Sequence, residues 1–397
     1  MQTQTVAVLF GGRSAEHEVS VITGHQIMDA LEAAGYGLLP IYITKAGGWY
    51  AGEALHNISL YARPTFDVSQ MPDVYRVSLS PDRTIRQLVP HPDTGRRWFR
   101  QVPRLWADVF FPTIHGSFGE DGTLQGLFEM ADVAYVGSGV LASAVGMDKV
   151  RMKALCRDAD IPVLDCLSLP RVAWHRDPEG FVSQVEATWR YPLIVKPVCL
   201  GSSIGVQRCE DGQALRDAIA AAILLDERVL VEPALVDFFE INCAVLGPPE
   251  QVSVCEQPHT GEAILSFDAK YKQGGKGAKT GAAKGGMASM GRTVPAAISS
   301  ALTTRLQELA MRAFQVLGAA GVARVDFLVE TATDKVYFNE INTLPGSLAF
   351  YLWEASQIPF DDLVTRVVTI ALEHHQTRRA TQFAFTANLL QRSAKPS

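Results

Sequence analysis

The stretch "ARVDFLVETATDKVYFNEIN", residues 323–342, contains two apolar runs that flank the turn-rich spacer "TATD". This pattern predicts a β-hairpin. Side chains two residues apart on a strand point to the same side. Arg324 and Asp326 therefore share a face of the first strand, and Glu340 and Asn342 share a face of the second. If the strands pair across the turn, four polar groups meet at one end of an otherwise apolar sheet.

These four residue types suit one kind of chemistry. Asp326, Glu340 and Asn342 offer hard oxygen ligands, which Mg²⁺ prefers and usually shares with substrate phosphates. Arg324 would balance phosphate charge beside them. A half-solvated strand also alternates polar and apolar residues, so the hairpin alone fits either a metal–phosphate site or an exposed sheet face.

Two lysines and a short loop favour the phosphate interpretation. Lys196 ends the apolar strand "LIVKP", and Lys149 follows "MD" at the start of a helix. A lysine at the end of a buried strand invites an anionic partner. The loop "LGSSIGV" (200–206) could turn backbone N–H groups toward phosphate, or it could be a plain turn. Glu232 follows another apolar strand, where its carboxylate could accept from an adenine amino group or a ribose hydroxyl.

The segment "GGKGAKTGAAKGG" (274–286) is rich in glycine and lysine. It fails the G-x-x-x-x-G-K-[ST] pattern because Ala278 precedes Lys279, so a P-loop NTPase is not expected. Lys270 and Tyr271 in "FDAKY" come just before it. Mobility from glycine and attraction from lysine are what a lid over phosphate needs. A surface insertion with no ligand is the alternative.

The rest of the chain alternates strands with helices. Its 397 residues suggest two or three domains. Apolar runs at 5–10, 38–44 and 107–116 surround helical patterns and predict an α/β domain over residues 1–145, although residues 46–105 look irregular. A central unit is expected over 146–239, and a third, with the hairpin and the lid, over 240–397.

Composition excludes several classes of protein. The net charge of −6 does not indicate a nucleic-acid or membrane surface, and no apolar run is long enough to span a bilayer. The N-terminus lacks the pattern of a signal peptide. The six cysteines have no metal-ligand spacing and are expected to be free thiols in a reducing compartment. We therefore predict a cytoplasmic protein.

Seven segments together resemble the D-alanine–D-alanine ligase family of the ATP-grasp superfamily. They are "LFGGRSAEHEVSVITG" (9–24), "FPTIHGSFGEDGTLQG" (111–126), "YVGSGVLASAVGMDKVRMK" (135–153), "YPLIVKPVCLGSSIGV" (191–206), "DAKY" (268–271), "ARVDF" (323–327) and "FNEINTLPG" (338–346). The resemblance implies a three-domain ATP-grasp fold of α/β and α+β units, with nucleotide held between the second and third domains.

The resemblance also assigns roles to positions. It implies that Glu16 holds the amino group of the first D-alanine, that His115 lies near the reacting carboxylate, and that Arg324 and the backbone N–H of Gly346 face the developing oxyanion. It implies binding of ATP and its phosphates by the following residues: Lys149, Lys196, Ser202, Ser203, Glu232, Glu240 and Lys270. Lys270 and Tyr271 match the lid, and Ser202 and Tyr271 are also expected at the catalytic centre. Asp326, Glu340 and Asn342 match the ligands of two Mg²⁺ ions, for which Mn²⁺ could substitute.

The implied reaction is ATP-dependent ligation of D-alanine to a second D-amino acid through an acyl phosphate, for peptidoglycan precursor synthesis. Family members are often dimers, so a homodimer is an expectation. The segment after Gly346 is shorter than usual in the family; Ser347 or Tyr351 stands near the place of a serine that grips the second substrate's carboxylate. D-Alanine is the leading acceptor, with D-serine, D-lactate or another amine-bearing acid as the alternative. A non-catalytic nucleotide-binding relative, and a kinase or carboxylase on the same fold, also stay open.

Overall fold

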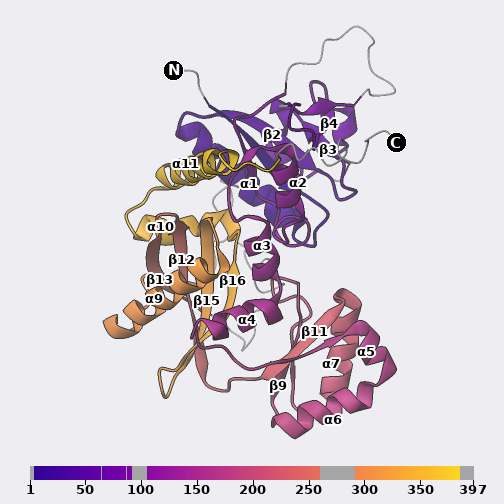
Figure 1. Cartoon of the computed structure of the whole chain (residues 1–397), viewed down its shortest axis with the longest axis vertical. Helices are drawn as coiled ribbons and strands as arrows, with labels where there is room; N and C mark the ends of the chain where they lie inside the picture. Colours follow the sequence, from indigo (N-terminus) through magenta and orange to yellow (C-terminus); the bar gives the residue numbers. More distant parts are fainter. Residues whose placement is uncertain (1–3, 64, 86, 92–104, 260–290, 385–397) are drawn as a thin grey trace, which may run out of the picture.

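The computed structural model describes residues 4–63, 65–85, 87–91, 105–259 and 291–384. Three sheets follow one another along the chain (Figure 1). Lys270, Tyr271 and the segment 274–286 lie outside the described residues, so the predicted lid stays a prediction. Across the part of the chain that is described, no helix is long and apolar enough to cross a membrane.

The first sheet has seven strands in the order β5-β4-β3-β2-β1-β6-β7. Its parallel centre consists of β1 (Thr5–Gly11), β2 (Gly37–Ile43), β6 (Val109–Pro112) and β7 (Ala134–Tyr135). Buried residues fill these central strands, as expected for a sheet covered on both faces. Helices α1 (His17–Ala33), α2 (Thr123–Ala131) and α3 (Val140–Met147) accompany the sheet.

The region 46–105, which looked irregular in sequence, extends this sheet with short antiparallel strands. These are β3 (Trp49–Ala51), β4 (Tyr75–Ser78) and β5 (Val89–Pro90). Single helical turns at Glu53–His56, Ile58–Leu60 and Val68–Gln70 connect them. Strands of this length carry too few residues for an alternating pattern to stand out.

The second sheet has the order β10-β9-β11-β8. Its strands are β8 (Leu167–Pro170), β9 (Leu193–Pro197), β10 (Gln207–Cys209) and β11 (Arg228–Pro233), all antiparallel to their neighbours. Helices α5 (Arg171–Arg176), α6 (Pro178–Thr188) and α7 (Gly212–Leu225) cover it. Helix α4 (Lys149–Asp158) leads into this unit, and Asp148 caps its first turn by accepting from the N–H groups of Val150 and Arg151.

The third sheet has the order β14-β13-β12-β15-β16 and contains the expected hairpin. Its strands are β12 (Phe238–Gly247), β13 (Gln251–Pro258), β14 (Arg292–Thr293), β15 (Gly321–Glu330) and β16 (Val336–Asn342). Helix α9 (Ser300–Leu317) packs against the sheet through Leu306, Ala310 and Phe314. It begins at Ser300, where Ser299 caps it by accepting from the N–H of Leu302.

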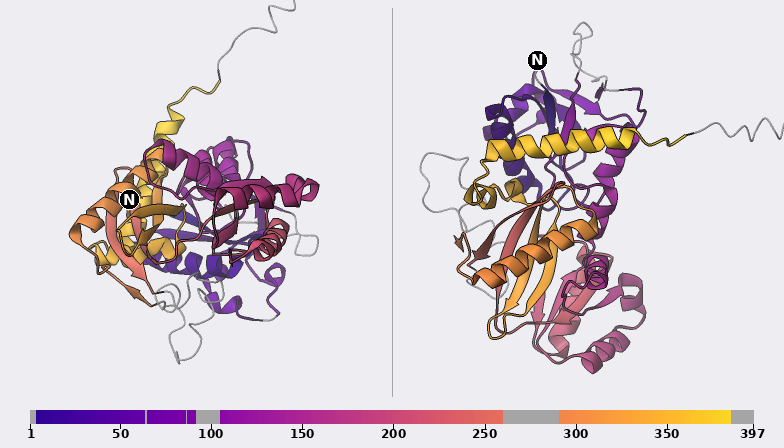
Figure 2. Two further views of the ribbon diagram at one scale, coloured as in Figure 1. Left: turned by 90° about the horizontal axis from the view of Figure 1, so that it is seen from below. Right: turned by 60° about the vertical axis from the view of Figure 1, so that its left-hand side comes forward.

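The chain returns to the first sheet after the hairpin. A single turn at Gly346–Ala349 and helix α10 (Phe350–Ala355) precede α11 (Phe360–Arg379). Helix α11 lies along the N-terminal unit, where Val364, Val367 and Val368 share one apolar core with residues of β1 and α1 (Figure 2). The third sheet is thereby tied to the first. The domain boundaries expected at 145 and 239 stay predictions.

Candidate functional site

One cavity lies where the three sheets approach one another, and it collects the polar residues singled out in the sequence. All the predicted site residues that fall in the described part of the chain line it, namely Glu16, His115, Lys149, Lys196, Ser202, Ser203, Glu232, Glu240, Arg324, Asp326, Glu340, Asn342 and Gly346. They come from loops and strands of all three sheets. The cavity therefore brings together groups that are far apart in sequence.

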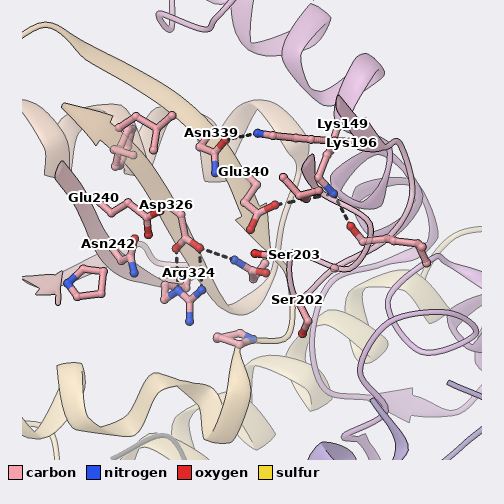
Figure 3. A pocket seen from close by; sticks show the side chains of 18 of the residues that line it. Lys149, Lys196, Ser202, Ser203, Glu240, Asn242, Arg324, Asp326, Asn339 and Glu340 are labelled. Carbon is pink, nitrogen blue, oxygen red and sulfur yellow. Dashed lines mark hydrogen bonds and ion pairs between the residues drawn. The ribbon is translucent and has the colours of Figure 1, made fainter. Parts of the chain in front are cut away.

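The hairpin forms as predicted and presents its polar face to the cavity. Strands β15 and β16 are antiparallel, with Arg324 opposite Asn342 and Asp326 opposite Glu340. The Arg324 guanidinium donates to both carboxylate oxygens of Asp326, with Nε and Nη2 each 2.7 Å away, and Asn342 Nδ2 donates to Asp326 Oδ2 at 3.0 Å. Figure 3 shows Arg324, Asp326 and Glu340 on the sheet, with Glu340 pointing toward Lys149.

This donor set fits a magnesium ion. Asp326 and Glu340 supply two carboxylates directly across the strand pair, and Asn342 adds an amide oxygen beside them. Mg²⁺ is commonly held by one or two carboxylates together with substrate phosphates, because it keeps a strict octahedral shell. Among the described residues no group of three His, Cys, Asp or Glu forms a complete metal cage. The set is therefore suited to an ion that arrives with a phosphate ligand.

Two lysines face the hairpin from the second sheet and from α4. Lys149 Nζ lies 3.8 Å from Glu340 Oε2 and donates to the backbone oxygen of Leu200 at 2.5 Å. Lys196 Nζ donates to Asn339 Oδ1 at 3.2 Å (Figure 3). Burial lowers the pKa of Lys149, against the charge of Glu340, and the neighbouring charge of Lys196 lowers it further. Both ammonium groups stand where phosphate oxygens would neutralise them.

Glu232, which the sequence suggested as an adenosine contact, lines the cavity and is held by two lysines. Its side chain is 2% exposed and lies between two lysines: Lys196 Nζ is 2.6 Å from Oε1, and Lys153 donates to Oε2. Burial alone would raise the pKa of the Glu232 carboxyl, but the charges of Lys153 and Lys196 outweigh burial and lower it to about 2. The carboxylate holds the two lysines in place. Sequence reasoning missed Lys153, although its i, i+4 spacing from Lys149 puts both on one face of α4.

The loop between β9 and β10 approaches the N-terminal unit. Ser202 and Ser203 have left-handed backbone angles, with φ of 53° and 57°, so the loop turns sharply there. The Ser202 hydroxyl donates to Glu16 Oε1, and Glu16 stands just before α1. The chain that leads from β1 to Glu16 passes through Gly11 and Gly12, which both have positive φ, and a Cβ on Gly11 would lie 2.3 Å from the Ile43 carbonyl oxygen.

His115 and Glu120 form the wall beside Glu16. His115 Nε2 lies 3.0 Å from Thr23 Oγ1, and Nδ1 lies 4.0 Å from Glu120 Oε2. Burial lowers the pKa of His115, so the ring is neutral near pH 7, while the Glu16 charge opposes that effect. Glu120, absent from the sequence predictions, accepts from the backbone N–H groups of Gly116 at 2.7 Å and Leu344 at 3.2 Å. It thus ties the His115 loop to the segment before Gly346.

The segment after β16 places Gly346 in the cavity wall but turns Ser347 away from it. Ser347 is 2% exposed, donates from its hydroxyl to Gln26 Oε1, and does not line the cavity. Tyr351 does line the cavity, and its hydroxyl donates to Glu256 Oε1 at 2.8 Å. Of the two residues suggested for this place by the sequence, Tyr351 is therefore the one that lines the cavity.

Comparison with known proteins agrees with this arrangement. Residues 5–138 match the family described as "D-ala D-ala ligase N-terminus", and residues 155–369 match "D-ala D-ala ligase C-terminus". Among curated proteins, the chain is 39% identical to a D-alanine–D-alanine ligase of Heliobacterium modesticaldum over 96% of this chain and 97% of the relative. It is 37% identical to the ligase of the same name from Chloroherpeton thalassium over 96% and 99% of the two chains.

Solved structures give the same picture. The D-alanine–D-alanine ligase from Coxiella burnetii superposes with a TM-score of 0.77 at 29% identity, over 96% of this chain and 97% of the other. The VanG D-Ala:D-Ser ligase from Enterococcus faecalis superposes with a TM-score of 0.75 at 28% identity, over 93% and 100% of the two chains. The fold is the three-sheet ATP-grasp arrangement that the sequence predicted, and the chain belongs to the D-alanine–D-alanine ligase family.

Proposed function

We propose that this enzyme joins D-alanine to a second D-alanine, with ATP as the energy source, to make the dipeptide used for peptidoglycan precursors. The observation that carries the proposal is the single cavity that combines a phosphate end, formed by Lys149 and Lys196, with a reaction centre at Arg324 and Gly346. Membership of a ligase family supports it, because the relatives of similar length are named for this reaction.

The reaction has two balanced steps. A carboxylate oxygen of the first D-alanine attacks the γ-phosphorus of ATP; the bond from that phosphorus to the β–γ bridging oxygen breaks, and ADP leaves with the electron pair. The amine nitrogen of the second amino acid then attacks the acyl carbon, the bond to the phosphate oxygen breaks, and inorganic phosphate leaves. The attacking nitrogen loses its extra protons to solvent. The products are dipeptide, ADP and phosphate.

Residues of the chain have distinct tasks in these steps. Glu16, fixed by the Ser202 hydroxyl, would bind the ammonium group of the first D-alanine. Lys149 and Lys196 would bind phosphate oxygens, and Ser203 would contribute from the loop beside them. Glu240 would contact the nucleotide from β12. Neutral His115 would lie beside the reacting carboxylate without adding a charge there.

Arg324 and the N–H of Gly346 would stabilise the oxyanion of the tetrahedral intermediate. Asp326 keeps the guanidinium at a fixed angle through two hydrogen bonds of 2.7 Å. Asp326, Glu340 and Asn342 would hold two Mg²⁺ ions, which would neutralise the crowded charge of the triphosphate. The homodimer and the cytoplasmic location expected from the sequence stay predictions, as do the lid roles of Lys270 and Tyr271.

A product analysis tests the proposal. The protein is incubated with ATP, Mg²⁺ and a panel of D- and L-amino acids and D-hydroxy acids, and the products are identified by mass. We expect ADP, phosphate and D-alanyl-D-alanine in equal amounts when D-alanine is the sole amino acid. ATP hydrolysis without a dipeptide, or no turnover with D-alanine, would contradict the proposal. Preferential formation of a mixed product with D-serine or D-lactate would change the acceptor and keep the first step.

A further inference from the structure

A row of polar side chains crosses the third sheet beneath the cavity. Glu256 on β13 lies opposite Asn242 on β12, Asn242 lies opposite Asp326 on β15, and Asp326 lies opposite Glu340 on β16. Residues directly opposite in antiparallel strands share a face of the sheet, so the row is continuous. All four members line the cavity.

The row has a cation at each end. Lys149 lies 3.8 Å from Glu340 at the β16 end. At the β13 end, Arg292 Nη1 donates to Glu256 Oε2 at 3.0 Å. Arg324 stands between the two ends, beside Asp326 (Figure 3). The site therefore offers two separate places for anions, one on each side of the reaction centre.

At the β13 end, Arg292 and Glu256 form a buried ion pair with further hydrogen bonds. The Glu256 carboxylate accepts from Arg292, from the Tyr351 hydroxyl at 2.8 Å and from Asn242 Nδ2 at 3.1 Å. The guanidinium carbon of Arg292 stands 4.0 Å from the centre of the Tyr351 ring, and the side chains of Arg292 and Glu256 are 12% and 3% exposed. A guanidinium held by a carboxylate and stacked on an aromatic ring has a fixed plane.

The Arg292 end lies next to the reaction centre. Tyr351, on which the Arg292 guanidinium stacks, lines the same cavity as Arg324. Glu256 and Asp326, which hold the two guanidiniums, lie two strands apart in the same row across the sheet. In an α-amino acid one carbon separates the amine from the carboxylate. An acceptor whose amine attacks the acyl carbon at Arg324 therefore presents its carboxylate a short distance from that point.

Two lysines that line the described part of the cavity lie at the opposite end of the row. Lys149 and Lys196 surround Glu340 and Asn339, where the phosphates belong. A planar guanidinium matches a carboxylate with two parallel hydrogen bonds. We propose that Arg292 binds the carboxylate of the acceptor amino acid and so favours second substrates that carry a carboxylate one carbon from the attacking group. Glu256 and Tyr351 act as positioning residues. This inference rests on the proposed ligase function and deepens it.

The test separates the acceptor step from the first step. Hydroxylamine has no carboxylate and traps an acyl phosphate as the hydroxamate. Arg292→Gln should leave D-alanine hydroxamate formation unchanged, with the same KM for the donor. It should raise the KM for acceptor D-alanine roughly 10- to 100-fold, the effect of one charge-assisted hydrogen bond. It should also reduce the ratio of kcat/KM for D-alanine to kcat/KM for D-alaninamide as acceptors.

Three further variants control for loss of charge, for misfolding and for the removal of any arginine. Arg292→Lys keeps the charge without the planar fork, so the acceptor KM should fall between those of the wild type and Arg292→Gln. The double variant Glu256→Gln/Arg292→Gln removes both buried charges and should match Arg292→Gln in acceptor KM while keeping a folded core. Arg305→Gln removes an exposed arginine on α9, outside the cavity, and should match the wild type.

The inference would be overturned if Arg292→Gln and the double variant both keep the wild-type KM for acceptor D-alanine and the wild-type preference for D-alanine over D-alaninamide. It would also be overturned if the rates of hydroxamate and dipeptide formation fall by the same factor. A wild-type enzyme that forms neither product would refute the ligase function itself. The two failures can be told apart, because the inference alone fails when the wild type forms both products and the Arg292 variants bind the acceptor as tightly as the wild type does.

Discussion

The buried pair of Lys153 and Glu232 gives the sharpest prediction about stability. Both side chains are 2% exposed, and Lys196 is the second cation on the same carboxylate. A pKa lowered from 4.5 to about 2 corresponds to about 3 kcal/mol of stabilisation of the charged carboxylate in the folded state. Lys153→Met removes one of the two cations and leaves the carboxylate buried.

Breaking a buried ion pair from one side typically costs about 3–5 kcal/mol. Lys196 remains 2.6 Å from Glu232, so we expect the lower end, about 3 kcal/mol. The free energy of unfolding would be measured at pH 7 with urea. Lys335→Met, the same substitution at an exposed lysine after the hairpin turn, is the matched control and should change the unfolding free energy by less than about 0.5 kcal/mol.

The pH dependence of stability gives a second readout. The folded-state pKa of Glu232 is depressed, so its contribution is present above the unfolded-state pKa of 4.5 and is lost as the pH falls toward 2. In Lys153→Met the folded-state pKa rises toward 4.5, so this contribution should shrink and its loss should be complete at a higher pH than in the wild type. A variant with the wild-type urea midpoint and acid profile would refute the account of this pair.

Other predictions follow from the site. Glu340→Gln should abolish dipeptide synthesis at ordinary Mg²⁺ and leave the circular dichroism spectrum and melting temperature intact; normal turnover would remove Glu340 from the metal site. Glu16→Gln should raise the KM for the first D-alanine roughly 10-fold or more, measured by hydroxamate formation, because a charge-assisted contact is lost; an effect on ATP alone would contradict its role. The buried rings of His17, His25 and His115 have pKa values lowered mainly by burial, so they resist protonation in the folded state. The unfolding free energy should therefore fall as the pH drops below the unfolded-state value of 6.5, and a flat profile between pH 7 and 5 would contradict this.

The hairpin shows which part of the site a local sequence pattern can predict. The period of two along a strand and one turn-rich spacer were enough to bring Arg324, Asp326, Glu340 and Asn342 to one face, and the structure has them opposite one another in register. The helix start at Lys149 was predictable from its local sequence, and Asp148 caps that helix. The family resemblance supplied what the pattern could not, namely the amino-acid substrate.

Contacts between segments that are distant in sequence could not be predicted from the sequence. The Glu120 carboxylate accepts from the N–H of Gly116 and from the N–H of Leu344. Leu344 is 224 residues away from Glu120 in sequence. Arg292 joins the site only because the two-residue strand β14 pairs with β13, and such a strand has no period to detect. The ion pair of Glu232 with Lys153 was not predicted, because the position of Glu232 after a strand says nothing about a side chain that reaches it from α4. Packing between elements decides these cases.

The most direct test of the central claim follows an oxygen atom. D-Alanine labelled with ¹⁸O at both carboxylate oxygens is supplied with ATP and Mg²⁺, and the released phosphate is analysed by mass spectrometry. If the carboxylate attacks the γ-phosphorus and the amine later displaces phosphate, each phosphate released carries one ¹⁸O atom and each is matched by one dipeptide. Phosphate without label, released in step with dipeptide, would show that no acyl phosphate forms and would contradict the account.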